Sequence, residues 1–359
     1  MRSRSLSLAL CGLVAGCAHA GKLAPEKALT KEERWDAIRR ASVWSPRDVA
    51  SADIRKGPPS KEHFAWNQWV DCEYREKKFS GHSAKLGCDI EPGHTLKVKY
   101  GEDNGEVIGE ALGTRLLWAL GFTADRMYPV RVRCRGCPKD PWNHKQVTAE
   151  VEEFDPAVIE LRAPGREMES SPKSGWTWSE LALVGPDSDP SERAHRDGLK
   201  LLAAFVQHTD SKAANQRLLC PPGEEAGEKD CRHPVLMVSD LGLTFGRANL
   251  LSRNRYAGVN FALWSTTPVW KNAEKCEADL AFSATGTLHN PHVSEAGRKF
   301  LADLLLQLSD TQIRELFETA RVELRPRDPA KGGEPASVEE WVAAFKRKRD
   351  EIVNNHCPQ

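Results

Sequence analysis

The chain has 359 residues, of which 40% are hydrophobic and 28% are charged. This length allows two domains or one large one, and the composition excludes a wholly disordered protein. Basic and acidic side chains number 51 each, so the formal net charge is zero. That balance excludes a nucleic-acid-binding protein that works through bulk positive charge. Beyond the N-terminus there is no apolar run of about 18–20 residues, so no transmembrane helix is expected there.

The first residues have the layout of a secretory signal peptide. Two arginines precede an apolar stretch over 6–14, and small residues follow. The residues over 14–17, VAGC, resemble a bacterial lipobox, in which the peptide is cut before the cysteine and the cysteine is diacylated. The resemblance implies a signal peptide over 1–16 and a membrane anchor at Cys17. It also implies an exported lipoprotein of the bacterial cell envelope, on the periplasmic side. Ala18 stands where many inner-membrane lipoproteins have aspartate, which favours the outer membrane.

The cysteines agree with export. Eight remain beyond the signal, and an even number in an oxidising compartment favours disulfides. Pairing each cysteine with its nearest neighbour predicts Cys72–Cys88, Cys134–Cys137, Cys220–Cys231 and Cys276–Cys357. The CRGC segment that begins at Cys134 is also typical of a redox or zinc pair, although the sequence has no second CxxC segment.

A small β-rich lobe with one helix is predicted over 61–165. A tether over 17–60, with one short helix within 18–45, precedes it, because that part begins with small, charged and proline residues. Alternation around glycines predicts two strands and a turn over 78–100. From Gly105 to Gly121 apolar residues recur at helical spacing, and the last glycine is suited to end a helix. Further strands are predicted over 127–134 and 147–162.

A larger, mainly helical lobe is predicted over 166–359. An apolar stripe predicts a helix that begins at Ser191 and ends near His208. A capping box at Ser337 predicts a helix that ends near Asn354. Amphipathic helices are also expected over 294–308 and 311–320, and a strand over 235–238. The predicted fold class is α+β, with two lobes of unequal size.

Two polar clusters in this second lobe have the composition that phosphoryl transfer requires. This chemistry needs a carboxylate that orients the attacking hydroxyl, oxygen ligands for Mg²⁺, and a cation near the moving phosphate. Asp210, Lys212 and Asn215 supply all three from one short segment. Asp240, after the predicted strand, supplies a second carboxylate, and Gly242 lets the chain turn there. Alone, Asp210 and Asn215 are as typical of an Asx turn.

The order of these clusters resembles that of protein-kinase-like folds. Residues 208–215, with the pattern H-x-D-x-K-x-x-N, resemble a kinase catalytic loop, and Asp240-Leu241-Gly242 resembles the metal-binding D-F-G segment. The gap between the two aspartates is longer than in common protein kinases, and the expected Cys220–Cys231 loop accounts for the excess. Residues 81–85, GHSAK, resemble the short phosphate loop of HipA-type kinases. The chain resembles the disulfide-containing secretory-pathway kinases more loosely.

This resemblance implies a two-lobed, protein-kinase-like fold that uses ATP, or another nucleoside triphosphate, with Mg²⁺ or Mn²⁺. Asp210 would then accept the proton of the acceptor hydroxyl. Asn215 and Asp240 would hold the metal, and Lys212 would steady the γ-phosphate.

The β-rich lobe would supply the residues that bind the nucleotide. These are Gly81, Ser83, Lys85 and Lys97. Lys97 would pair with the phosphates and be oriented by Glu110 on the helix that follows. Lys99 and Glu106 are the alternatives, because Lys97 and Lys99 lie on the same face of their strand.

The function that follows is an exported, lipid-anchored phosphotransferase. The alternative is a non-catalytic envelope lipoprotein, in which a kinase-like scaffold binds a nucleotide, a glycan or a protein, since ATP is scarce outside the cytoplasm and fold does not determine function. A purely structural envelope protein is the third hypothesis, but it leaves the spacing of Asp210, Asn215 and Asp240 to chance.

Overall fold

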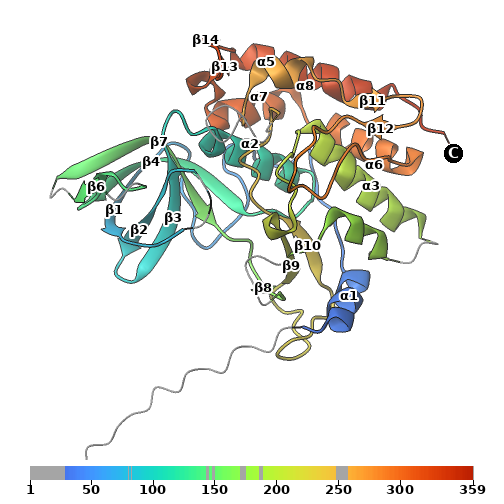
Figure 1. Cartoon of the computed structure of the whole chain (residues 1–359), viewed down its shortest axis with the longest axis horizontal. Helices are drawn as coiled ribbons and strands as arrows, with labels where there is room; N and C mark the ends of the chain where they lie inside the picture. The colour runs from blue at the N-terminus through green and yellow to red at the C-terminus, as the bar shows by residue number, and fades with distance from the viewer. Residues whose placement is uncertain are drawn as a thin grey trace, which may run out of the picture.

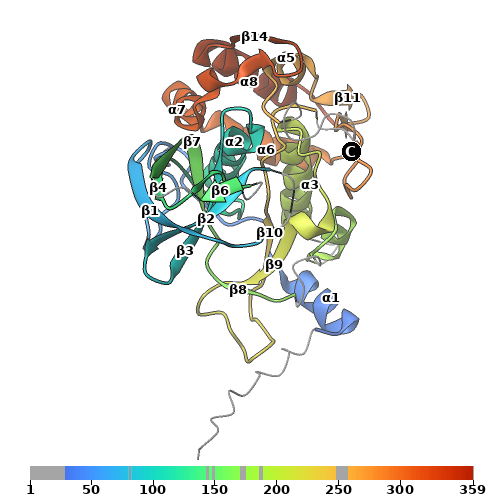
Figure 2. The same ribbon diagram turned by 60° about the vertical axis from the view of Figure 1, so that its left-hand side comes forward.

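The computed structural model describes residues 29–79, 81, 83–142, 145–147, 150–169, 175–185, 189–247 and 258–358. A barrel of strands lies beside a larger, mainly helical region (Figures 1 and 2). The predicted α+β class, with a β-rich part followed by a mainly helical one, is confirmed. The predicted signal peptide over 1–16 and the predicted anchor at Cys17 lie outside the described residues. No helix in the described part of the chain is long and apolar enough to cross a membrane.

The barrel is closed by five strands in the order β1, β2, β3, β7, β4. Their bounds are β1 (Trp69–Arg75), β2 (Lys85–Glu91), β3 (His94–Tyr100), β7 (Val151–Leu161) and β4 (Arg126–Arg135). β1 and β4 pair in parallel, and the other neighbours are antiparallel. Alternate side chains such as Val70, Leu96 and Val130 turn inward and form a core of their own. A short hairpin, β5 (Pro138–Asp140) and β6 (Lys145–Val147), extends from the barrel.

Helix α2 (Gly105–Ala119) belongs in packing to the helical region, although it lies between two barrel strands in the sequence. Ile108, Leu112 and Leu116 are buried in the large core of that region. Figure 1 shows α2 where the barrel meets the other helices. The helix that was predicted from Gly105 is confirmed, and it forms the common wall of the two parts.

The helical region is built around one large hydrophobic core. Its helices are α1 (Lys31–Arg40), α3 (Pro190–Phe205), α5 (Phe261–Thr266), α6 (Glu295–Leu306), α7 (Asp310–Ala320) and α8 (Val338–Val353), with the 3-10 turns η1 (Trp178–Leu183), η2 (Ala213–Asn215) and η3 (Val322–Leu324). The capping box predicted at Ser337 is present and begins α8. Helix α3 begins one residue earlier than predicted, at Pro190, because Asp189 takes the N-cap position.

Short strands complete this region. β8 (Arg166–Glu167), β9 (Gln216–Cys220) and β10 (Val235–Val238) form a three-stranded sheet, and two hairpins consist of β11 (Trp270–Asn272) with β12 (Glu277–Ala278) and of β13 (Pro326–Asp328) with β14 (Gly332–Pro335). β10 is the strand predicted before Asp240. The segment between β7 and β8 passes from the barrel to this sheet and is called the connector below (residues 162–165).

The described part of the predicted tether, residues 29–60, is packed. Helix α1 opens with a capping box between Thr30 and Glu33. Ile38, Val49 and Ile54 are buried in the core of the helical region. This differs from the tether expected from composition, because a few apolar residues at suitable spacing are enough to bury a segment that is charged elsewhere.

The predicted disulfides are confirmed in all four pairs: Cys72–Cys88, Cys134–Cys137, Cys220–Cys231 and Cys276–Cys357. Because a disulfide leaves no thiolate to bind zinc, the zinc alternative for Cys134 and Cys137 is not the state seen here. The Cys220–Cys231 disulfide joins the two ends of the loop between β9 and β10. This loop accounts for part of the sequence between Asp210 and Asp240.

Candidate active site

A cavity of about 530 Å³ brings together the residues predicted for phosphoryl transfer. It is lined by Gly81, Ser83, Lys85, Lys97, Glu110, Asp210, Lys212, Asn215 and Asp240, and also by Lys99 and Glu106. The barrel and the loop before β2 supply Gly81, Ser83, Lys85, Lys97 and Lys99, and α2 supplies the glutamates. The segments after α3 and β10 supply Asp210, Lys212, Asn215 and Asp240. The cavity thus lies where the barrel, α2 and the helical region meet.

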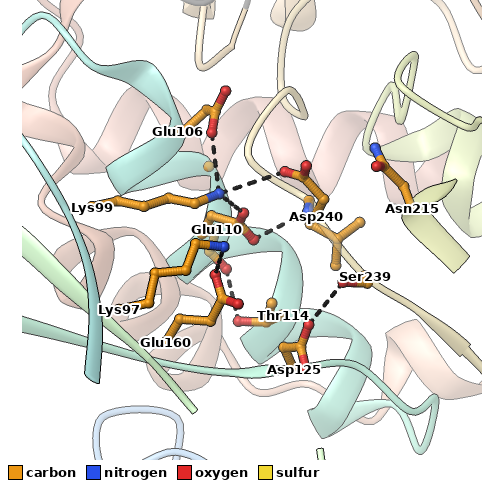
Figure 3. A network of polar contacts seen from close by, with 12 residues as sticks. Lys97, Lys99, Glu106, Glu110, Thr114, Asp125, Glu160, Asn215, Ser239 and Asp240 are labelled. Carbon is orange, nitrogen blue, oxygen red and sulfur yellow. Dashed lines mark hydrogen bonds and ion pairs between the residues drawn. The ribbon is translucent and has the colours of Figure 1, made fainter. Parts of the chain in front are cut away.

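Lys99, and not Lys97, makes the ion pair at the centre of the cavity. Its ammonium contacts Glu110 and lies 3.1 Å from Glu106 Oε2 and 3.5 Å from Asp240 Oδ1 (Figure 3). The predicted Lys97–Glu110 pair is wrong, and the alternative lysine takes its place. Both lysines point from the same face of β3. However, Lys97 lies opposite Glu160 of β7 and pairs with it, whereas Lys99 lies opposite the uncharged Val158 and reaches α2 instead.

The charges around Lys99 reinforce one another. Burial opposes its positive charge, but attraction to Glu110, Asp240 and Glu106 outweighs burial and holds the pKa of Lys99 well above its usual range. Burial likewise opposes the charge of Asp240, and the ammonium groups of Lys99 and Lys212 hold the pKa of Asp240 well below its usual range. Burial raises the pKa of Glu110. The gathered carboxyl oxygens of Glu106, Glu110 and Asp240 are of the kind that a hard divalent cation takes as ligands.

A row of glycines on α2 allows the Asp240 loop to approach this cluster. A Cβ at Gly109 would lie 2.2 Å from the carbonyl oxygen of Gly242, and a Cβ at Gly113 would lie 2.7 Å from Leu241 Cβ. Because these atoms are absent, the loop rests directly on the helix backbone. There the amide of Leu241 donates to Glu110 Oε2 at 3.1 Å. Asp240 adopts a left-handed backbone conformation, with φ of 53°, at the turn between β10 and this loop.

The segment after α3 holds Asp210 and Asn215 in a fixed arrangement. The ammonium of Lys212 donates to both carboxylate oxygens of Asp210, at 2.8 and 2.6 Å. Asn215 Nδ2 donates to the Asp210 carbonyl at 2.9 Å, and the Ser239 amide donates to the Asn215 carbonyl at 2.8 Å. The backbone of Asn215 is thereby joined to Ser239, the residue immediately before Asp240.

The glycine–lysine loop closes the barrel side of the cavity. Gly81 has a φ of +95°, and a Cβ there would lie 2.9 Å from Lys85 Nζ, so the residue is suited to a close turn over the lysine. The hydroxyl of Ser83 is buried and has no hydrogen-bond partner among the described residues. Burial, together with repulsion from Lys99 and Lys97, lowers the pKa of Lys85 to about 8. His82 lies outside the described residues.

The donor set fits a hard divalent cation. Single oxygens of Glu106, Glu110 and Asp240 all lie within 4.8 Å of one another. Asp240 and Asn215 also line the cavity, and carboxylate and amide oxygens are the ligands that Mg²⁺ and Mn²⁺ take in proteins. The residues predicted as metal ligands are therefore compatible with that role.

Sequence reasoning missed a second polar group beside the connector. Lys97 pairs with Glu160, and Asp125 accepts hydrogen bonds from Ser239 and from the connector. Arg162 and Arg217 both pair with Glu167 at the same end of the cavity. No local signal identifies these residues, because each is an ordinary charge on a strand or turn and its partner is remote in sequence.

His208 is packed at the start of the segment that holds Asp210 and Asn215. Both ring nitrogens are buried and have no hydrogen-bond partner in the described part of the chain. Burial lowers the pKa of His208 to about 4, so the ring is neutral at physiological pH. Its contact with the Trp178 ring, at 6.1 Å between centroids, fits a structural residue.

The chain is similar to a solved structure at low sequence identity. No protein-family model and no curated protein matches this sequence. Among solved structures, the chain is similar to a proinflammatory kinase of Helicobacter pylori, CtkA, with a TM-score of 0.40 and 10% identity. The match covers 79% of this chain and 93% of that chain. The geometry of the cavity, and not this likeness, supports the function proposed below.

Proposed function

We propose that this protein is a kinase-like phosphotransferase that uses a nucleoside triphosphate and Mg²⁺ or Mn²⁺. One observation carries the proposal: a buried lysine, Lys99, contacts Glu110 and lies close to Asp240 in a cavity that also contains Asp210 and Asn215. Charged residues that only stabilise the fold would not require a cavity of about 530 Å³ lined by both lysines and carboxylates. A nucleotide phosphate chain with its cation would match both the lysines and the carboxylates.

Each residue has a distinct part in this proposal. When bound, the metal would neutralise charge on the phosphates, and Asp240 and Asn215 are the residues that would hold it. Lys99, oriented by Glu110, would donate to phosphate oxygens, and the buried pair fixes its ammonium before the nucleotide arrives. Asp210 would accept the proton of the acceptor hydroxyl, and Lys212, bound to Asp210, would carry positive charge to the moving phosphoryl group.

Nucleotide binding is the first test. For the wild type, ATP or GTP with Mg²⁺ or Mn²⁺, each at a hundredfold excess over its dissociation constant, should stabilise by about 2.7 kcal/mol. For a chain of 359 residues this raises the melting temperature by about 4 °C. Asp240→Asn should lose the part of the shift that depends on metal, because it removes a carboxylate ligand. Asp210→Asn should keep the shift and lose transfer of label from γ-³²P nucleotide.

The control is Asp303→Asn, the same change at an exposed residue of α6 that pairs only with Lys299. It should behave as the wild type. Absence of any nucleotide-dependent shift in the wild type would contradict the proposal. A metal-dependent shift without transfer to water, to the protein or to an envelope extract would favour the non-catalytic scaffold instead.

We also propose that the protein is exported and anchored to the envelope by lipid at Cys17. Four disulfides support an oxidising compartment, where such bonds persist. Expressed in a bacterium, the full chain should fractionate with membranes, weakly favouring the outer one, and Cys17→Ser should move it to the soluble fraction or leave its signal uncleaved. Mass spectrometry of the N-terminal peptide gives the acyl mass directly. An unmodified Cys17 in the membrane-extracted wild type would contradict the anchor.

A further inference from the structure

Asp125 occupies an unusual place for a charged residue. It lies between α2 and β4, is only 6% exposed, and still lines the cavity. Its carboxylate accepts two hydrogen bonds from different parts of the chain. The backbone amide of Ala163, in the connector, donates to Oδ1 at 3.0 Å, and the hydroxyl of Ser239 donates to Oδ2 at 2.8 Å (Figure 3).

The two groups that Asp125 joins belong to different segments that both line the cavity. Ser239 is the residue immediately before Asp240, and Ala163 is in the segment by which the barrel continues into the helical region. The backbone around Asp125 is itself fixed to β10, because the Val238 amide donates to the Thr123 carbonyl at 3.1 Å. This backbone pairing makes no contact with the connector, and the side chain of Asp125 supplies one through the Ala163 amide.

Asp125 remains an acceptor at neutral pH although its surroundings raise its pKa. Burial, reinforced by the negative charge of Glu160, raises the pKa of Asp125 to about 6, while the hydrogen bond from Ser239 and the nearby Lys97 oppose the rise. Above pH 6 the carboxylate is ionised and accepts both bonds. A buried carboxylate that accepts from two segments costs more to disturb than an exposed one, because its partners would be left unsatisfied.

We propose that Asp125 is a positioning residue, which holds the Asp240 loop in a fixed place relative to the connector. It thereby fixes the carboxylate of Asp240, the proposed metal ligand, relative to the barrel strands that would contact the nucleotide. Through Ser239, it acts on Asp240 without touching the ligand. The metal and nucleotide in this proposal rest on the proposed function. The two hydrogen bonds by which Asp125 joins the connector to the Asp240 loop do not depend on it.

Three variants separate positioning from charge. Asp125→Ala removes both bonds. Asp125→Asn keeps both, because its oxygen accepts from Ala163 and its amide donates to the Ser239 oxygen. Ser239→Ala removes only the bond to the Asp240 loop. Arg126→Ala is the matched control, since Arg126 donates to the connector at the Arg162 carbonyl, 2.8 Å away, and is not bonded to Ser239.

The first readout needs no ligand. In hydrogen exchange of the full chain, Asp125→Ala should speed exchange at Ala163 and over 239–241, whereas Asp125→Asn and Arg126→Ala should leave 239–241 as in the wild type. The second readout is ATP affinity with and without Mg²⁺. Asp125→Ala and Ser239→Ala should reduce the Mg²⁺-dependent gain about tenfold and leave metal-free ATP affinity unchanged, and Asp125→Asn should restore the gain.

The outcomes are distinguishable from those of the proposed function. Unchanged exchange over 239–241 in Asp125→Ala overturns the positioning role, whatever the protein binds. Equal losses of affinity with and without Mg²⁺ also overturn it, because they indicate general damage. If the wild type shows no Mg²⁺-dependent gain, the proposed function fails, and the exchange result still decides whether Asp125 holds the loop.

Discussion

Replacing Lys99 with methionine is expected to lower phosphate transfer by a factor of about 10²–10³. It is also expected to destabilise the fold by about 3–5 kcal/mol. The side chain is 2% exposed, and its ammonium is shared by Glu106, Glu110 and Asp240. Methionine fills nearly the same volume, so the change leaves little cavity and isolates the electrostatic effect. Removing the ammonium leaves the buried side chains of Glu106 and Glu110 without the cation that they share, and this is the costly case for a buried charge network.

The pH dependence of this variant has a definite sign. Burial raises the pKa of Glu110 to about 8, and Lys99 opposes that rise, so the loss of Lys99 should raise this pKa further. The folded variant then keeps the Glu110 proton to higher pH than the wild type does. Stability of Lys99→Met should therefore fall, relative to the wild type, as pH rises above about 8, and recover as pH falls. Urea unfolding at several pH values between about 7 and 9.5 measures this directly.

Lys97→Met is the matched control. Lys97 leaves the same face of β3, but it pairs with Glu160 and its side chain is 29% exposed. Its loss should reduce stability far less than that of Lys99, and transfer should fall by much less than a hundredfold. If Lys99→Met retained transfer while Lys97→Met lost it, the roles assigned to the two lysines would be reversed.

The choice between these lysines shows where sequence reasoning stops. Alternation places both on one strand face, and this much is correct. What separates them is the partner opposite each on β7, Glu160 for one and Val158 for the other. Strand pairing between residues about sixty apart fixes that difference, and no local pattern contains it.

Features that follow from the order of the cysteines or from local residue spacing were predicted well. The disulfides close between cysteines adjacent in sequence order, and the helix from Gly105 follows its own apolar spacing. The segment over 208–215 and the Asp240 loop were singled out because each concentrates its polar groups in a few residues. Asp125 and Glu160 were missed because each is a single acidic residue whose place in the site depends on a partner remote in sequence, Ser239 and Lys97 respectively. The same limit explains the packed segment over 29–60, whose burial depends on surfaces supplied by the rest of the chain.

Gly109→Ala is expected to destabilise the protein by more than about 2 kcal/mol and to remove metal-dependent nucleotide binding. Helix propensity alone predicts the opposite, since Gly→Ala inside a helix ordinarily stabilises by about 0.5–1 kcal/mol. Here the added Cβ would lie 2.2 Å from the Gly242 carbonyl oxygen, a backbone atom that has no rotamer in which to escape. The loop must move away from α2, which breaks the bond from the Leu241 amide to Glu110 and carries Asp240 away from Lys99.

Gly113→Ala, one turn further along α2, provides the comparison. Its Cβ would meet the side chain of Leu241 at 2.7 Å rather than a backbone carbonyl, so part of the clash can be relieved by side-chain movement. We therefore expect a smaller loss of stability than at Gly109, with weakened but measurable metal-dependent binding. Urea unfolding gives the two stabilities and thermal shifts with Mg²⁺ and ATP give the binding. A stabilised Gly109→Ala would mean that the loop does not rest on the helix, and the close approach that assembles Lys99, Glu110 and Asp240 would lose its physical basis.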